Sequence, residues 1–221
     1  QGYRALRDFL AAKLRRDAGI GCSGNDILIT SGSLQALDLV NHTLLARGDT
    51  VLIEEDCYQG SINRLLKLGV TPVGIPLDRE GLRIDALARA RRVPFIIDAA
   101  YGLPFPGIQH EHLDSLWNPN VVLCLSLSKL GLPAARTGII VADESIIEAL
   151  TAFNATAALA PPSTGPVIVE PLLRSTSIRS IDPAAKRSMA KKSIFRNVLI
   201  IPICLRRSAV RYTVKPNRFR L

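Results

Sequence analysis

Short apolar runs alternate with segments of helical periodicity over most of the chain. Six nearly continuous apolar runs predict buried strands, at residues 26–30, 50–53, 70–75, 93–98, 121–126 and 137–142. Between and beside them, apolar residues recur at helical spacing and predict helices, at residues 3–14, 34–45, 58–68, 84–90 and 144–154. Strands that are apolar on both faces and are separated by helices are typical of a mostly parallel sheet. We therefore expect a three-layer α/β domain with helices on both faces of the sheet.

The end of the chain differs from the rest in composition. Residues 174–221 hold thirteen Lys and Arg but one acidic residue, whereas residues 1–173 hold fifteen basic and eighteen acidic residues. The net charge of +9 therefore lies in this tail, and the overall charge is a poor guide to the partners of the whole chain. Periodicity is also lost there, and Pro202 interrupts the apolar stretch at 198–205. We predict a globular part, residues 1–173, and a basic, irregular tail, residues 174–221.

Membrane, secreted and metal-binding proteins are not favoured by the sequence. The apolar runs are shorter than a membrane span, and no basic-then-apolar leader opens the chain. His110-Glu111-His112 is the one histidine cluster, and without further ligands at metal-binding spacing it predicts no metal site. We interpret the widely spaced cysteines as reduced thiols of a cytoplasmic protein, namely Cys22, Cys57, Cys124 and Cys204.

The most informative segment is Ser126-Leu127-Ser128-Lys129, which is followed by Arg136. A lysine directly after a buried strand must be exposed, paired or chemically used. Partial burial lowers the pKa of an amine, which suits a lysine that attacks an aldehyde. Arg136 is suited to bind a phosphate through two hydrogen bonds, and the serines add hydroxyl donors. For Lys129 alone, a surface lysine in a strand-to-loop turn is the more common situation, but the whole group favours a cofactor site.

A second candidate group is Asp98 with Tyr101. Asp98 ends an otherwise apolar strand, and a buried carboxylate needs a cationic partner such as a protonated pyridine nitrogen. Tyr101, three residues later, has a phenol that can donate to a ring oxygen. A helix cap or an ordinary surface acid at a strand end remains the alternative for Asp98.

Two further signals follow the first two predicted strands. Thr30-Ser31-Gly32-Ser33-Leu34 is a strand–turn–helix segment, and backbone N–H groups at a helix N-terminus bind anions such as phosphate. Tyr58 follows the strand at 50–53 and is suited to stack on an aromatic ring, although a lone tyrosine more often packs against a core. All of these residues lie at strand ends, where ligands collect in α/β sheets.

These motifs resemble the class I/II aminotransferases of the aspartate aminotransferase fold, which use pyridoxal 5′-phosphate (PLP). The resemblance implies that Lys129 holds the cofactor, that Asp98 pairs with its pyridine nitrogen and that Tyr101 binds its 3-oxygen. It also implies that Tyr58 stacks on the ring. The residues that it implies around the phosphate are Gly32, Ser33, Leu34, Ser126, Ser128 and Arg136.

The resemblance covers about residues 1–175, and residues 93–166 look most like the valine–pyruvate aminotransferases within the family. The segments IIDAAYGLPFPGI, LWNPNVVLCLSLSKLGLPAARTGIIVADE and LAPPSTGP carry this narrower likeness. The family's Asn-Pro-Thr-Gly motif is missing between Tyr58 and Asp98, and the segment LARARR at 87–92 suggests an internal deletion of a strand. The basic tail stands where the family has a small domain with a carboxylate-binding arginine.

The expected activity is transamination between an amino acid, such as valine or alanine, and a 2-oxo acid such as pyruvate. The resemblance also implies a homodimer. Two alternatives remain open: a degenerate, inactive aminotransferase fragment, and, less favoured, a nucleic-acid binder that acts through the basic tail. The tail contains few aromatic residues and no known nucleic-acid-binding motif.

Overall fold

The computed structural model describes residues 1–55, 57–75, 94–99, 117–128, 133–174 and 197–200. Its seven strands form one sheet in the order β1-β6-β5-β4-β7-β2-β3. The strands are β1 (Ile27–Thr30), β2 (Thr50–Glu54), β3 (Thr71–Ile75), β4 (Phe95–Ala99), β5 (Val121–Ser126), β6 (Gly138–Val141) and β7 (Asn197–Ile200). Strands β1 to β6 confirm the six predicted strands within a few residues at each end.

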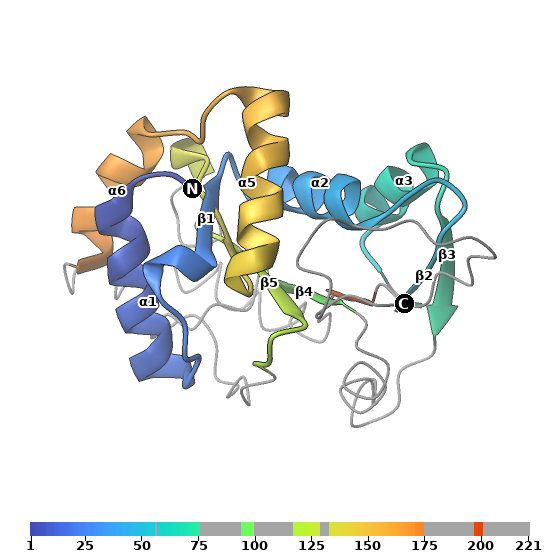
Figure 1. Ribbon diagram of the computed structural model, residues 1–221, viewed down its shortest axis with the longest axis horizontal. Coiled ribbons are helices and arrows are strands. Elements are labelled where there is room, and N and C mark those ends of the chain that lie inside the picture. Colours follow the sequence, from blue (N-terminus) through green and yellow to red (C-terminus); the bar gives the residue numbers. More distant parts are fainter. Residues whose placement is uncertain (56, 76–93, 100–116, 129–132, 175–196, 201–221) are drawn as a thin grey trace, which may run out of the picture.

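Helices cover both faces of this sheet, as predicted (Figure 1). They are α1 (Arg4–Ala18), α2 (Ser33–Leu44), α3 (Gln59–Lys67), α5 (Glu144–Ala158) and α6 (Thr164–Arg174), with short 3-10 turns at η1 (Gly24–Asp26) and η3 (Pro133–Ala135). The predicted helix at 84–90 lies outside the described residues. Helix α6 was not predicted, because a segment with Gly165, Pro166 and Pro171 carries strong helix-breaking signals; Pro166 falls in its first turn, where the missing N–H has no helical partner to lose.

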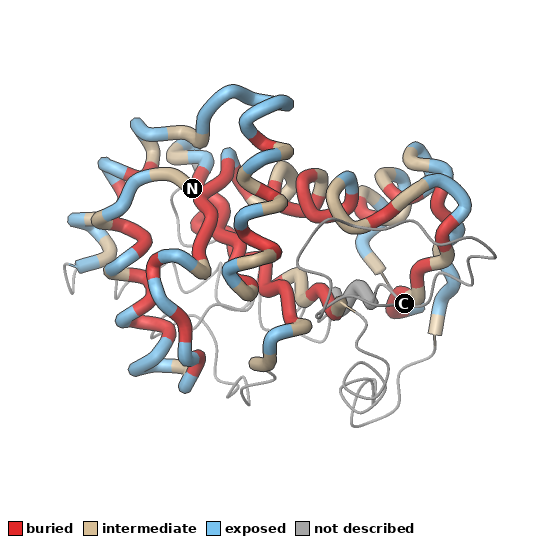
Figure 2. Tube along the Cα trace, viewed as in Figure 1, coloured by how far each residue is buried: buried red, intermediate tan, exposed pale blue. Residues whose placement is uncertain are grey.

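Alternate side chains of the central strands point to opposite faces and build two cores. On one face, Leu28, Val122 and Ile140 pack with α2, α3 and α5. On the other face, Ile29 and Leu125 pack with α1 and α6. Figure 2 shows this pattern as buried positions along the sheet and on the inward sides of the helices. Strands buried on both faces explain why the apolar runs in the sequence are continuous rather than alternating.

The strand β7 departs from the prediction of an irregular tail after residue 173. It lies between β2 and β4 and pairs with both in the antiparallel direction. Its contact with β4 covers four residue pairs, from Phe95↔Ile200 to Asp98↔Asn197, and its contact with β2 covers two.

The described helices give no sign of membrane insertion. None of them is long and apolar enough to cross a bilayer.

Candidate cofactor site at the carboxyl edge of the sheet

Strand direction brings the candidate residues to a single edge of the sheet. Strands β1 and β5 each pair antiparallel with β6, β4 is parallel to β5, and β2 is parallel to β3. Because β7 is antiparallel to both β2 and β4, the first five strands all run in one direction. Their carboxyl ends therefore meet at one edge. The amino ends of β6 and β7 lie at this same edge.

The turn after β1, residues 31–34, has N–H donors suited to bind an anion, and we call it the phosphate cradle. Gly32 precedes α2 with φ 92° and ψ 164°, a conformation that only glycine adopts without strain. This geometry turns the chain sharply, so that α2 begins at Ser33 with its first N–H groups at the edge of the sheet. The first-turn N–H groups of a helix have no partner within the helix and carry partial positive charge. Ser33 and Leu34 therefore present donors suited to a phosphate.

Arg136 brings a positive charge to the same turn. Its guanidinium lies against Gly32: a Cβ at that position would sit 2.5 Å from the arginine Nη2. Nη2 also donates to the Ser31 carbonyl at 3.3 Å. The backbone of Arg136 has φ 40°, an uncommon conformation for a residue with a side chain, and the side chain is exposed. The turn and Arg136 are thus in contact, although they are more than 100 residues apart in sequence.

Ser126 and Gly138 lie on the strands next to this turn. Gly138 pairs with Ser126 of β5 on one side and with Thr30 of β1 on the other. A Cβ at Gly138 would lie 2.5 Å from both the Gly32 carbonyl carbon and the Thr30 hydroxyl, so only glycine fits there. The hydroxyl of Ser126, itself 2% exposed, accepts a hydrogen bond from the Ser128 amide at 3.3 Å. These contacts place both serines next to the phosphate cradle.

Asp98 lies on β4, beside β5, and is level with Cys124, two residues before Ser126. It is paired with Cys124 of β5 and with Asn197 of β7. Its carboxylate acts on two thiols: burial and the Asp98 charge raise the pKa of Cys124, while burial, Glu54 and then Asp98 raise the pKa of Cys57 to about 11. The negative charge of Asp98 is therefore felt both across the sheet and in the loop after β2.

Tyr58 lies after β2, at the carboxyl edge of the sheet. It immediately precedes α3, and its side chain is 53% exposed. Its neighbour Cys57 lies within the electrostatic reach of Asp98, so the loop after β2 approaches the end of β4. A ring that is more than half exposed suits a stacking role better than a role in the core.

Lys129 and Tyr101 lie outside the described residues. Lys129 follows Ser128, the last described residue after β5, and Tyr101 lies two residues after the end of β4. The last described residues before them, Ala99 and Ser128, lie at the edge where the other candidates gather. His110, Glu111 and His112 also lie outside the described residues, and the described part of the chain contains no group of three or more side chains suited to a metal ion.

Two features near these residues are not evident from the sequence, namely Gly138 and Cys57. Gly138 is the second residue of the segment TGIIVA and the first of β6, and a glycine at the start of a buried strand is the signal that could have indicated close backbone approach. Cys57 was interpreted only as one of four reduced thiols, since no sequence signal shows that the charge of a carboxylate on β4 reaches it.

A chemical test of the Asp98–Cys57 proximity follows from the raised pKa of Cys57. A thiol of pKa about 11 stays protonated well above neutral pH, and its reactivity rises as pH approaches 11. At pH 8 iodoacetamide should modify it roughly 100-fold more slowly than an unperturbed thiol. Asp98→Asn removes one cause of the shift and should accelerate the reaction roughly two- to fivefold. Peptide mass spectrometry measures each site.

Cys22 is the internal control for this experiment. Its pKa is also raised to about 11, by burial and then Asp26, and Asp98 makes no contribution. Its rate should be the same in both proteins. Equal rates at Cys57 with and without Asp98 would contradict the arrangement.

Comparison with known proteins shows the family to which this chain belongs. The family model for aminotransferase class I and II matches residues 70–201. The chain is 42% identical over 124 residues to a valine–pyruvate aminotransferase of Escherichia coli (strain K12), a match that covers 56% of this chain and 30% of that protein. Among solved structures, the valine–pyruvate aminotransferase of Salmonella typhimurium LT2 superposes with a TM-score of 0.64 at 28% identity, covering 86% of this chain and 59% of that one. A Thermus thermophilus aspartate aminotransferase superposes with a TM-score of 0.69 at 16% identity, covering 87% of this chain and 59% of that one.

These neighbours show that the chain has the aspartate aminotransferase fold. The chain belongs to the aminotransferase class I and II family. It spans 30% of the length of the E. coli relative. The family match extends to residue 201, beyond the limit near residue 175 that the sequence motifs suggested, and so includes β7.

Proposed function

We propose that this chain supplies the cofactor-binding part of a PLP-dependent aminotransferase. The observation that carries the proposal is the cradle in which Arg136, the Gly32 turn and the start of α2 meet. It offers the Arg136 guanidinium, the N–H groups of the first turn of α2, which have no partner within the helix, and the buried hydroxyl of Ser126. Together these are the donors that a phosphate monoester requires. The residues present therefore fit the phosphate of PLP.

The remaining candidates fit the rest of the cofactor. We assign the ring nitrogen to Asp98, the ring face to Tyr58, the 3-oxygen to Tyr101, and the phosphate additionally to Ser126 and Ser128. Asp98 has the negative charge that keeps a pyridine nitrogen protonated. The Asp98 charge, after burial of the thiols themselves, raises the pKa of both Cys124 and Cys57, which supports a carboxylate that acts on this edge of the sheet.

Bound PLP supplies an electron sink that lets the α-proton leave an amino acid. Lys129 is proposed to hold the cofactor covalently through its amine and to move that proton as a general base and then a general acid. For both tasks the amine must be uncharged at the start of the step, which a site that excludes water favours. The amino group then passes to a 2-oxo acid.

The substrates are proposed from the relatives that the chain resembles. Likeness to valine–pyruvate aminotransferases supports a small aliphatic amino acid such as valine or alanine as the donor and pyruvate as the acceptor. We further propose a cytoplasmic homodimer. Free thiols at Cys22, Cys57 and Cys124 suit a reducing compartment, and exposed apolar side chains on α6, at Val167, Ile168 and Leu172, suit a protein interface.

Residues 1–173 are proposed as an incomplete cofactor-binding domain, to whose sheet residues 197–200 add a strand. The proposed deletion near residues 87–92 lies outside the described residues. Its expected consequence is a missing strand between β2 and β4, and β7 holds that position.

Single-turnover conversion tests the proposed reaction. The purified chain, loaded with PLP and mixed with L-valine, should yield pyridoxamine phosphate and the matching 2-oxo acid in equal amounts, measured by chromatography. Adding pyruvate should regenerate PLP and release alanine. PLP that binds but is never converted would support the degenerate-fragment alternative instead. Retention of the chain on nucleic acid at low salt, lost on removal of residues 201–221, would support the tail-binding alternative.

A further inference from the structure

The inference that follows rests on the proposed function and concerns the placement of Tyr58. The ring of Tyr58 lies against the backbone of the first turn of α3. A Cβ built on Gly60 would lie 2.3 Å from Cε1 of that ring and 2.8 Å from Cζ, so the absence of a side chain at Gly60 makes room for the ring. The Tyr58 carbonyl also accepts hydrogen bonds from the amides of Ser61 and Ile62 at 2.8 and 3.2 Å. Both the ring and the backbone of Tyr58 are thus fixed to the start of α3.

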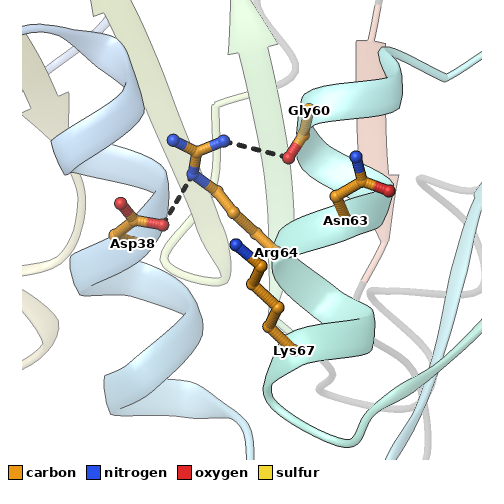
Figure 3. Close-up of a pocket in the computed structure, with 5 residues that line it drawn as sticks. All are labelled: Asp38, Gly60, Asn63, Arg64 and Lys67. Carbon is orange, nitrogen blue, oxygen red and sulfur yellow. Dashed lines mark hydrogen bonds and ion pairs between the residues drawn. The ribbon is translucent and has the colours of Figure 1, made fainter.

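The start of α3 is in turn tied to α2 by one arginine. Nε of Arg64 lies 2.7 Å from Oδ1 of Asp38 on α2. The two groups form an ion pair, but the direction of the N–H group does not suit a hydrogen bond. Nη1 of the same guanidinium donates to the Gly60 carbonyl at 3.0 Å. Figure 3 shows Arg64 lying between the two helices, with contacts to Asp38 on one side and Gly60 on the other.

These groups line a surface cavity of about 350 Å³ between α2 and α3, together with Asn63 and Lys67. Helix α2 begins at the phosphate cradle, and α3 begins next to Tyr58. A link between the two helices therefore fixes the distance between the proposed phosphate site and the proposed ring-stacking residue.

We propose that Gly60 and the Asp38–Arg64 ion pair are positioning residues, which hold the Tyr58 ring over the cofactor site and lock α3 to the helix that carries the phosphate cradle. None of the three touches the cofactor in this account. Gly60 acts by leaving space for the ring, and Arg64 acts by joining the carbonyl of Gly60 to the carboxylate of Asp38.

Gly60→Ala separates positioning from stability. Alanine favours helices over glycine, so the variant should keep or raise the melting temperature of the protein. Its methyl group nevertheless displaces the Tyr58 ring, and the dissociation constant of PLP should rise roughly 2- to 12-fold, the range of an aromatic contact. In a Tyr58→Ala background the same change should have no further effect, because the residue through which Gly60 acts is gone.

Arg64→Ala should weaken PLP binding in the same direction, and Arg64→Lys should restore it in part, since lysine keeps the charge facing Asp38 but not the fork that also reaches Gly60. Lys67→Ala is the matched control. Lys67 lines the same cavity as a cation on the same helix, and its removal should leave PLP affinity unchanged.

A readout without cofactor keeps this inference separate from the proposed function. The chain has four tyrosines, so NMR of protein labelled with ¹³C at the tyrosine rings resolves them, and Tyr58→Phe assigns the one of interest. In the cofactor-free protein, Gly60→Ala and Arg64→Ala should move the Tyr58 resonance, and Lys67→Ala should not. An unmoved Tyr58 resonance in both variants, or an undiminished effect of Gly60→Ala without Tyr58, would overturn the proposal. If PLP fails to bind the wild type, the proposed function fails, and the resonance still decides whether Gly60 and Arg64 position the ring.

Discussion

Arg136→Ala is expected to weaken PLP binding roughly 10- to 150-fold, the range for losing charge-assisted hydrogen bonds to a phosphate. The guanidinium lies against Gly32 and donates to Ser31, so it faces the cradle in which the phosphate is proposed to sit. Because the side chain is exposed, its removal should disturb little of the fold. Fluorescence titration with PLP measures the change.

Pyridoxal, which lacks the phosphate, provides the control ligand for this variant. Its affinity should be equally low for the wild type and for Arg136→Ala, because the arginine has nothing to bind. Arg4→Ala is the control variant: Arg4 is also exposed, and its ion pair within the described part of the chain is with Asp8 on its own helix. An equal loss of affinity for PLP and pyridoxal would show that Arg136 does not act on the phosphate.

Gly138→Ala is expected to lower the free energy of unfolding by about 1–3 kcal/mol, the usual cost of overpacking a buried site. The added methyl group would lie 2.5 Å from the Gly32 carbonyl carbon and from the Thr30 hydroxyl. Both atoms belong to the phosphate turn or its strand, so β6 must move away from the cradle. PLP affinity should fall together with stability. Denaturant unfolding, monitored by circular dichroism, measures the first effect.

Gly21→Ala is the matched control for this substitution. A Cβ at Gly21 has no heavy atom within 4 Å, and its backbone is not in the left-handed region. Its unfolding free energy should stay within about 0.5 kcal/mol of the wild type. If Gly138→Ala proved as stable as Gly21→Ala, the close packing of β6 against the phosphate turn would be refuted.

Most of the sheet could be predicted from the sequence because each strand carries its own signal. Runs such as VVLCLS at β5 are apolar on both faces and short, which indicates a strand covered by helices without any knowledge of its neighbours. The strand–turn–helix arrangement at residues 27–44 was predictable for the same reason: Gly32 and Ser33 stand between a strand and a helix in the sequence itself.

Other features depend on contacts that the sequence does not encode locally. Residues 197–200 form a strand because β2 and β4 leave a position between them. A segment of four residues has too little periodicity for the sequence to predict that pairing. Helix α6 forms despite Pro171 because Val169 is buried in the core against α1, so packing overrides propensity. The effect of Asp98 on Cys57 arises between segments more than forty positions apart.

The absorbance spectrum of the chain after incubation with PLP and dialysis tests the central claim most directly. Lys129 is proposed to hold the cofactor by a covalent bond, so the wild type should retain a near-visible absorbance band that Lys129→Ala lacks. A matched Lys67→Ala protein should retain the band like the wild type. No retained band in the wild type, or an equal band in Lys129→Ala, would contradict the account of this edge of the sheet as a working PLP site.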